Sequence, residues 1–203
     1  MEGPVSQDRW ATTLQARIDQ SLRTTEQLLE PHVMETVARI CDLLLTCLRN
    51  DGKAIFFGNG GSATEAQHLS AELLGRFYLD RPALPSVSLA DNTAAMTAIG
   101  NDYSYPDVFS RQIVGIGRPG DVAFGLTTSG DSVNVVRALE AAKGNGLLTV
   151  AFTGARGGRA AQIAHEAFRA PSEDTPRVQE AHLLVGHTMC EIVEAELFGA
   201  AAG

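Results

Sequence analysis

Lys53-Ala54-Ile55-Phe56-Phe57-Gly58-Asn59-Gly60-Gly61-Ser62 is the stretch that decides the fold. Residues 53–57 form a short apolar run, which is typical of a buried strand. The glycines that follow allow a sharp turn, because glycine adopts backbone conformations that other residues avoid. From residue 63 to 77 the apolar residues return to helical spacing. The stretch therefore predicts a strand, a glycine loop and a helix in succession.

The same order of elements recurs downstream. We expect strands at residues 86–89, 122–127, 147–152 and 167–170, and helices at residues 93–99, 133–143, 158–164 and 178–198. Continuous apolar strands that alternate with helices indicate a parallel sheet covered on both faces. The predicted fold class is α/β, a doubly wound parallel sheet flanked by helices, which ends in a long C-terminal helix.

Upstream of the deciding stretch, apolar residues recur at helical spacing in two segments, residues 8–29 and 33–48. Pro31 suits the first turn of the second helix, where a missing N–H costs nothing. We therefore expect one domain over residues 1–203, with residues 1–50 as an N-terminal helical extension and residues 51–203 as the α/β core.

Composition excludes several classes of protein. The chain has 203 residues and a net charge of -8, which disfavours general binding to nucleic acid or to an anionic membrane surface. Cys41, Cys47 and Cys190 lie in apolar stretches without a C-x-x-C pair, so we expect buried thiols and no disulfide framework. Residues 1–8 lack the pattern of a signal peptide, and no apolar run approaches about 18 residues. A cytoplasmic protein is expected.

Ligands of such sheets bind at the carboxyl ends of the strands, which here means the loops at residues 58–62, 101–102 and 127–132. The glycine loop matches neither G-x-G-x-x-G nor a P-loop, which disfavours a dinucleotide or a nucleoside triphosphate. Residues 127–132 carry four hydroxyl groups and a glycine before a helix, a suitable cradle for a phosphate monoester. The alternatives are a plain turn in the first loop and ordinary helix capping in the second.

His68 and Glu72 stand four residues apart on the helix after the glycine loop, so they share one face. An imidazole and a carboxylate placed in this way suit a metal site or general acid/base chemistry, although most such pairs are merely exposed. Gln179 and His187 lie eight residues apart, which separates them by about 12 Å along a helix. Spacing alone therefore does not pair them, and on the residues alone a histidine among Val185, Met189 and Ile192 is more often part of the core.

The sequence resembles the phosphoheptose isomerases of the sugar isomerase (SIS) superfamily. The resemblance begins in the glycine loop and continues in order through most of the chain from Lys53 to Phe198. The motifs that carry it are Gly58-Asn59-Gly60-Gly61-Ser62, Ala66-Gln67-His68, Glu72-Leu73-x-Gly75-Arg76-Phe77, Gly100-Asn101-Asp102, Phe109-Ser110-Arg111-Gln112, Thr128-Ser129-Gly130-Asp131-Ser132-x-Asn134, Thr153-Gly154 and Arg177-x-Gln179-Glu180.

The resemblance implies conversion of D-sedoheptulose 7-phosphate to D-glycero-D-manno-heptose 7-phosphate through an enediol, the first step of activated heptose biosynthesis. It also implies a homotetramer with active sites between subunits, in which a neighbouring chain or a distorted helix start would relieve the Gln179 to His187 spacing. By matching position, zinc would be held by His68, Glu72, Gln179 and His187. The substrate would be contacted by Asn59, Gly60, Gly61, Ser62, Glu72, Asn101, Asp102, Thr127, Thr128, Ser129, Ser132 and Gln179.

In this chemistry Glu72 is expected to be the base and His187 the acid. Zinc held by the same residues would instead polarise the carbonyl, and a histidine nitrogen bound to zinc cannot also donate a proton. The chain departs from the family pattern at Glu65, where aspartate is common, and at Thr127, where serine is frequent. Both replacements keep the functional group.

Two other functions compete with this interpretation. A related branch of the superfamily is a tetrameric adaptor for the bacterial replication initiator protein, and it does not keep the full His/Glu/Gln/His set. Glu72 and His187 are both present here, which favours the enzyme, because a binding protein has no need for a carboxylate at position 72. The second competitor is an isomerase of another phosphosugar.

Overall fold

The computed structural model describes residues 7–199. Residues 1–6, on which the expectation about a signal peptide largely rests, lie outside the described residues, as do residues 200–203. In chain order the elements are α1 (Gln7–Gln27), α2 (Pro31–Arg49), β1 (Ala54–Gly58), α3 (Gly61–Leu74), β2 (Ser86–Ser88), α4 (Thr93–Asp102), the 3₁₀ helix η1 (Tyr105–Asp107), α5 (Ser110–Ile116), β3 (Val122–Thr127), α6 (Val133–Gly144), β4 (Leu148–Thr153), α7 (Gly158–Ile163), β5 (Glu166–Arg169) and α8 (Thr175–Phe198).

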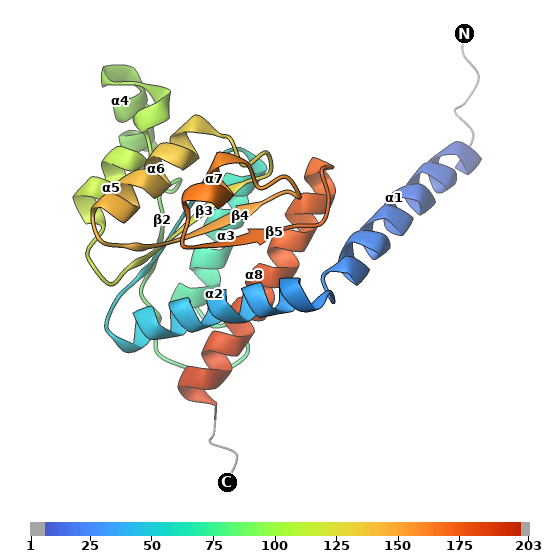
Figure 1. The fold of residues 1–203 in the computed structure, drawn as a ribbon, viewed down its shortest axis with the longest axis horizontal. Coiled ribbons are helices and arrows are strands. Elements are labelled where there is room, and N and C mark those ends of the chain that lie inside the picture. Colours follow the sequence, from blue (N-terminus) through green and yellow to red (C-terminus); the bar gives the residue numbers. More distant parts are fainter. Residues whose placement is uncertain (1–6, 200–203) are drawn as a thin grey trace.

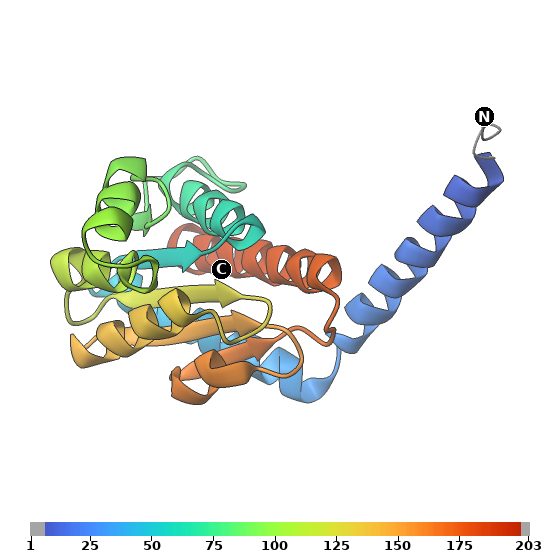
Figure 2. The ribbon, with the colours of Figure 1, turned by 90° about the horizontal axis from the view of Figure 1, so that it is seen from above.

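The five strands form one parallel sheet in the order β2-β1-β3-β4-β5. Figure 2 shows neighbouring strand arrows pointing the same way. Strands β1 and β3 are buried along their whole length, which explains why they read as continuous apolar runs. The doubly wound parallel fold predicted from the sequence is confirmed.

Two hydrophobic cores lie on the two faces of the sheet. One contains buried side chains of α2, α3 and α8, such as Leu44, Leu69 and Val185. The other contains buried side chains of α5 and α6, such as Ile113 and Leu139. Phe56 faces the first core and Phe57 the second, as successive residues of a strand must. Side chains of α3 and α8 both belong to the core that Phe56 faces, so the two helices lie on the same face of the sheet.

The strand order places the binding region. Chain order reverses direction between β1 and β3, which lie side by side in the sheet. Open α/β sheets bind ligands in the crevice outside the carboxyl ends of the strands at this reversal. The two loops that leave β1 and β3 at that end are the glycine loop and the hydroxyl-rich loop of residues 127–132.

The structure corrects the sequence-based prediction in three places. Asn101 and Asp102 form the last residues of α4 and not a loop. Two short elements, η1 and α5, were not predicted, because seven residues or fewer give too little periodicity to recognise. Helix α8 is regular from Thr175 onward, so a distorted helix start does not bring Gln179 closer to His187.

Helix α1 stands away from the layered body in both views (Figures 1 and 2). Its base is fastened to the start of α8, where Arg177 donates to the Arg17 carbonyl at 2.8 Å and Ser21 donates to Glu180 at 2.8 Å. The apolar residues that predicted a helix here, Leu14, Ile18, Leu22 and Leu29, are exposed, and so is Trp10. Among residues 7–199, no helix combines the length and apolar character that crossing a membrane requires.

Candidate active site

The glycine loop connects β1 to α3 in a conformation that requires glycine. Gly60 has φ +56°, which L side chains rarely adopt. A side chain at Gly58 would meet the backbone oxygen of Leu126 on β3 at 2.8 Å. The first-turn amides of Ser62 and Ala63 are not free, because they donate to the carbonyls of Asn59 and Gly60. The loop therefore offers a ligand fewer helix-terminal donors than the sequence suggested.

Three hydroxyl groups converge in the loop after β3. The Thr127 hydroxyl lies 3.3 Å from that of Ser129 and 3.0 Å from that of Ser132. Gly130 has φ +77°, and a side chain there would collide with the backbone of Gly157. Asp131 accepts from the backbone N–H of Arg159 at 2.8 Å and so ties the loop to α7. The cluster presents hydroxyl donors beside the N-terminus of α6, which suits a phosphate monoester.

Thr128 and Ser129 also line a small pocket of about 100 Å³ with Gly154 and Arg156. The Thr128 carbonyl accepts from the Gly154 N–H at 3.0 Å, which holds this loop against the end of β4. Two residues of the predicted phosphate cradle therefore line this pocket.

Asn59 is fixed by two residues that the sequence analysis did not select as site residues. Its side-chain amide forms two reciprocal hydrogen bonds of 2.8 Å with the amide of Asn134 on α6. The hydroxyl of Tyr105 donates to the same Asn59 oxygen at 2.9 Å. Asn134 was visible in the sequence only as part of a motif, and Tyr105 gave no signal. Together they fasten the glycine loop to the start of α6 and to η1.

His68, Glu72 and His187 come together between α3 and α8. Nε2 of His68 lies 2.7 Å from Nε2 of His187 and 3.4 Å from Oε1 of Glu72. The two imidazole rings meet nearly edge to face, with centroids 5.0 Å apart. His187 is thus half-buried beside its partners and is not a core histidine. The predicted pairing of His68 with Glu72 is extended across 119 residues of chain to His187.

A glycine on α8 allows this approach. A side chain at Gly186 would meet the buried Leu69 of α3 at 2.6 Å, so the two helices touch there with no room for a methyl group. Leu69 follows His68 and Gly186 precedes His187. The close contact therefore places the two imidazoles opposite each other.

Of the other predicted residues, Gln179 lies near the start of α8, and Asn101 and Asp102 lie at the end of α4. Gln179 lies against Gly61, where an added methyl group would overlap its amide. Gln179 is therefore at the glycine loop, and among the described residues no hydrogen bond joins its side chain to His68 or His187. Asn101 donates to Asp102 at 2.8 Å, both are exposed, and no hydrogen bond among the described residues joins their side chains to the two loops.

Glu65 and His182 form a buried polar pair next to this site. His182 is fully buried, its Nε2 lies 3.1 Å from the Thr153 carbonyl, and its Nδ1 lies 3.8 Å from Oε2 of Glu65. Neither oxygen of Glu65 has a hydrogen-bond partner in the described structure. Sequence patterns gave no reason to pair these residues, because they lie on different helices.

The group of His68, Glu72 and His187 fits a metal ion. One ligand atom from each residue lies within 4.8 Å of the other two. Two imidazole nitrogens that face each other with a carboxylate beside them are a donor set that divalent transition metals accept.

Comparisons with known proteins agree with this architecture. The SIS domain family model matches residues 18–154. The chain is 47% identical over 182 residues to the phosphoheptose isomerase of Sulfurimonas denitrificans, which covers 90% of this chain and 91% of that protein. It is 48% identical to the phosphoheptose isomerase of Aquifex aeolicus, with 79% and 84% of the two chains covered. The chain belongs to the phosphoheptose isomerase family.

A solved member of this family has the same fold. The structure of phosphoheptose isomerase GmhA from Neisseria gonorrhoeae superimposes with a TM-score of 0.86 and 38% sequence identity. The match covers 92% of this chain and 99% of the gonococcal chain. The family resemblance carried by the glycine loop is confirmed.

Proposed function

We propose that this protein is an aldose–ketose isomerase that converts D-sedoheptulose 7-phosphate to D-glycero-D-manno-heptose 7-phosphate, the first step of activated heptose biosynthesis. Its membership of the family supports the reaction. The single observation that carries the assignment is the meeting of His68, Glu72 and His187 between α3 and α8. An adaptor that only binds another protein does not need this cluster.

In the proposed binding mode the two loops hold the two ends of the substrate. The hydroxyls of Thr127, Ser129 and Ser132 bind the phosphate, with Thr128 beside them. The glycine loop, Gly60 to Ser62, and Gln179 face the sugar chain. Asn59 uses its backbone, because Asn134 and Tyr105 already engage its amide. Asn101 and Asp102 contact the sugar hydroxyl groups.

Isomerisation moves one proton from C1 to C2 of the sugar and a second from O1 to O2. Glu72 removes the proton from C1 and returns it to C2, which a carboxylate on one side of a planar enediol can do. His187 exchanges protons with the two oxygens, with His68 at 2.7 Å to accept or supply the hydrogen. The atoms balance, because each proton that leaves one position is returned to the next.

The same cluster would hold zinc through His68, Glu72 and His187. The fourth ligand expected from the family, Gln179, lies at the glycine loop in this chain, so a neighbouring subunit would have to supply it. When bound, zinc supplies a Lewis acid that polarises the sugar carbonyl. A His187 nitrogen that bound zinc could not also donate a proton, so metal binding and proton donation by that nitrogen would exclude each other.

We further propose that the subunits form a homotetramer. The exposed apolar stripe of α1 supports this. Packing the stripe of this 21-residue helix against a second chain would remove apolar side chains from water. A hollow of about 540 Å³ lies between the α1–α2 junction and β5, lined by Val33 and Phe168 among others, and contains none of the predicted site residues. Light scattering of the purified protein tests the state.

The decisive experiment is incubation of purified, metal-analysed protein with D-sedoheptulose 7-phosphate, followed by NMR of the aldoheptose product. Glu72→Gln keeps the shape of the side chain and removes the base, so turnover should fall by about 10²-fold or more. Glu191→Gln, an exposed change on α8, is the matched control. A fall of less than tenfold in Glu72→Gln removes Glu72 from the mechanism.

Chelation separates the alternatives. Loss of activity with a chelator and recovery with zinc would assign the cluster to the metal. Activity that survives complete metal removal would favour His187 as the acid. No product from folded, zinc-loaded protein would overturn the proposed reaction in favour of another phosphosugar or of the adaptor.

A further inference from the structure

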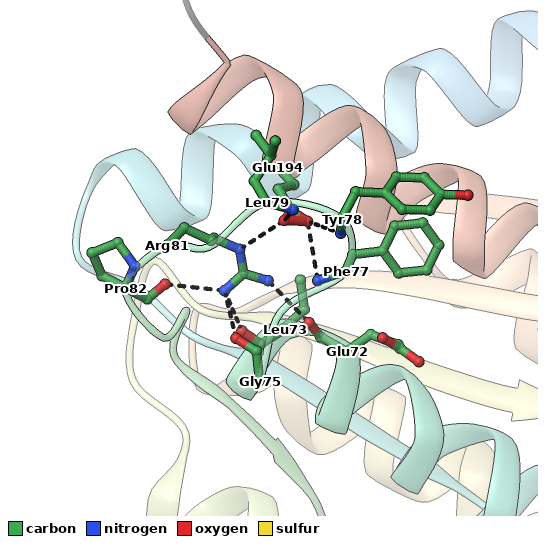
Figure 3. A network of polar contacts seen from close by, with 9 residues as sticks. All are labelled: Glu72, Leu73, Gly75, Phe77, Tyr78, Leu79, Arg81, Pro82 and Glu194. Carbon is green, nitrogen blue, oxygen red and sulfur yellow. Dashed lines mark hydrogen bonds and ion pairs between the residues drawn. The ribbon is translucent and has the colours of Figure 1, made fainter.

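A buried ion pair lies at the far end of α3, away from the glycine loop. The side chains of Arg81 and Glu194 are 1% and 2% exposed, and Nε of Arg81 lies 3.6 Å from Oε1 of Glu194 (Figure 3). Two fully buried charges are expensive unless many hydrogen bonds accompany them. The partners that each of them binds therefore show what the pair does.

Arg81 caps the C-terminal end of α3. Its guanidinium donates to the backbone carbonyls of Glu72 at 2.9 Å, Leu73 at 2.8 Å and Gly75 at 3.2 Å (Figure 3). The last carbonyls of a helix have no partners within the helix, and a cation there is favoured by the helix dipole. One of these carbonyls belongs to Glu72 itself. Arg81 thus fixes the backbone of the proposed catalytic base.

Glu194 fastens the loop that follows. Its Oε2 accepts from the backbone N–H groups of Phe77 at 3.1 Å and Tyr78 at 2.9 Å, and its Oε1 accepts from Leu79 at 2.7 Å (Figure 3). Burial raises the pKa of the Glu194 carboxyl, but the three N–H groups and Arg81 outweigh it, so the pKa lies below the usual range. Glu194 is therefore a carboxylate at neutral pH.

The fastened loop reaches the candidate active site. The ring of Phe77 packs against that of His187 with centroids 5.8 Å apart. Glu194 stands seven residues after His187 on α8, two turns along the same face. The network thus contacts both sides of the site, through the Glu72 backbone on α3 and through Phe77 on His187.

We infer that Arg81 and Glu194 are positioning residues that hold Glu72 and His187 in register for isomerisation and for metal binding. The inference rests on the proposed function for its kinetic part. In this role the pair does more than hold the loop at residues 75–85 in place, because it also sets the geometry of the site. A purely structural pair would change stability and leave the properties of the folded site unchanged.

The test compares buried and exposed versions of the same chemical change. Glu194→Gln and Arg81→Lys alter the network. Glu196→Gln and Arg49→Lys alter an ion pair between α8 and the end of α2, whose two side chains are more than half exposed; Glu196 lies two residues after Glu194. Each variant is purified as the full chain, its folding is checked by circular dichroism, and it is assayed well below its unfolding temperature.

We expect Glu194→Gln and Arg81→Lys to lower kcat by about 10- to 100-fold with KM changed less than threefold, because small displacements of a catalytic group have effects of this size. We also expect their zinc dissociation constants to rise by about 10-fold or more in titrations of apoprotein with zinc. The two exposed variants should stay within twofold of wild type in all three quantities. Folded network variants with wild-type kcat and zinc affinity would overturn the inference.

Two provisions keep the test decisive. If Glu194→Gln does not fold, Arg81→Lys decides, because it retains the buried positive charge and removes only the forked hydrogen bonds. If the wild-type protein does not isomerise the heptose phosphate, the proposed reaction fails, and the zinc titrations still decide whether the pair positions the cluster.

Discussion

Replacing Gly186 with alanine should force α3 and α8 apart at the contact that brings His68 to His187. The added methyl carbon would lie 2.6 Å from Cδ2 and 2.9 Å from Cδ1 of Leu69. Non-bonded carbons prefer about 3.5–4.0 Å, so the contact is too short by roughly 1 Å. Leu69 is 1% exposed, so its side chain cannot turn toward solvent. We therefore expect the helices to move.

The expected magnitude follows from two opposing terms. Overpacking a core costs about 1–3 kcal/mol, and alanine in place of glycine inside a helix returns about 1 kcal/mol. The net loss for Gly186→Ala is then about 0–2 kcal/mol. Gly115 on α5 is exposed, with nothing within 4 Å of an added methyl group. Gly115→Ala should therefore gain about 1 kcal/mol of helix propensity without any overpacking. The two variants should differ by about 1–3 kcal/mol.

Urea unfolding at one fixed protein concentration measures this difference, because association also contributes to the stability of an oligomer. Turnover should fall by about 10²-fold in Gly186→Ala, since a displacement of 1 Å can have that effect on catalysis, and should be unchanged in Gly115→Ala. Equal stabilisation of both variants, with full activity in both, would refute the claim that this glycine sets the spacing of the two histidines.

The three cysteine thiols should be unreactive in the folded protein, and the stability of the protein should depend on Glu194 at neutral pH but not at low pH. Burial raises the pKa of Cys41 and Cys47 to about 11 and that of Cys190 to about 12, so none of the three should react with a thiol reagent at pH 8 until the protein unfolds; rapid colour development with native protein would contradict this. Because the pKa of Glu194 is lowered on folding, its carboxylate stabilises the protein above the unfolded value of about 4.3, and this stabilisation is lost as the pH falls through the folded pKa. The stability difference between wild type and Glu194→Gln should therefore be largest near pH 7 and shrink below about pH 4, and a constant difference from pH 7 to pH 3 would show that the charge is not what matters.

Much of the fold was predictable because its signals are local. The apolar run before Gly58 and the hydroxyl groups after Leu126 mark strand ends, and parallel strands bring such ends to one edge of a sheet. Helices α3 and α8 have more than ten residues each, which is enough for periodicity to reveal them. Helix α5 and η1 were missed because they are too short for that signal.

The site itself was only half predictable. His68 and Glu72 lie on one helix face, so their pairing follows from spacing. The roles of Asn134 and Tyr105 beside Asn59, and of His182 beside Glu65, depend on contacts between distant segments. Periodicity carries no information about such contacts.

The sequence by itself determined the order of strands and helices, the glycine loop, the hydroxyl loop and the family, since each is encoded in consecutive residues. Only the tertiary structure decided that His187 faces His68 and that Gln179 lies at Gly61. The physical reason is the packing of α8 on α3, which is set by the absence of a side chain at Gly186 and by the buried pair of Arg81 and Glu194. These are interactions between residues over a hundred positions apart, and they exist only once the sheet has brought the two helices to the same face.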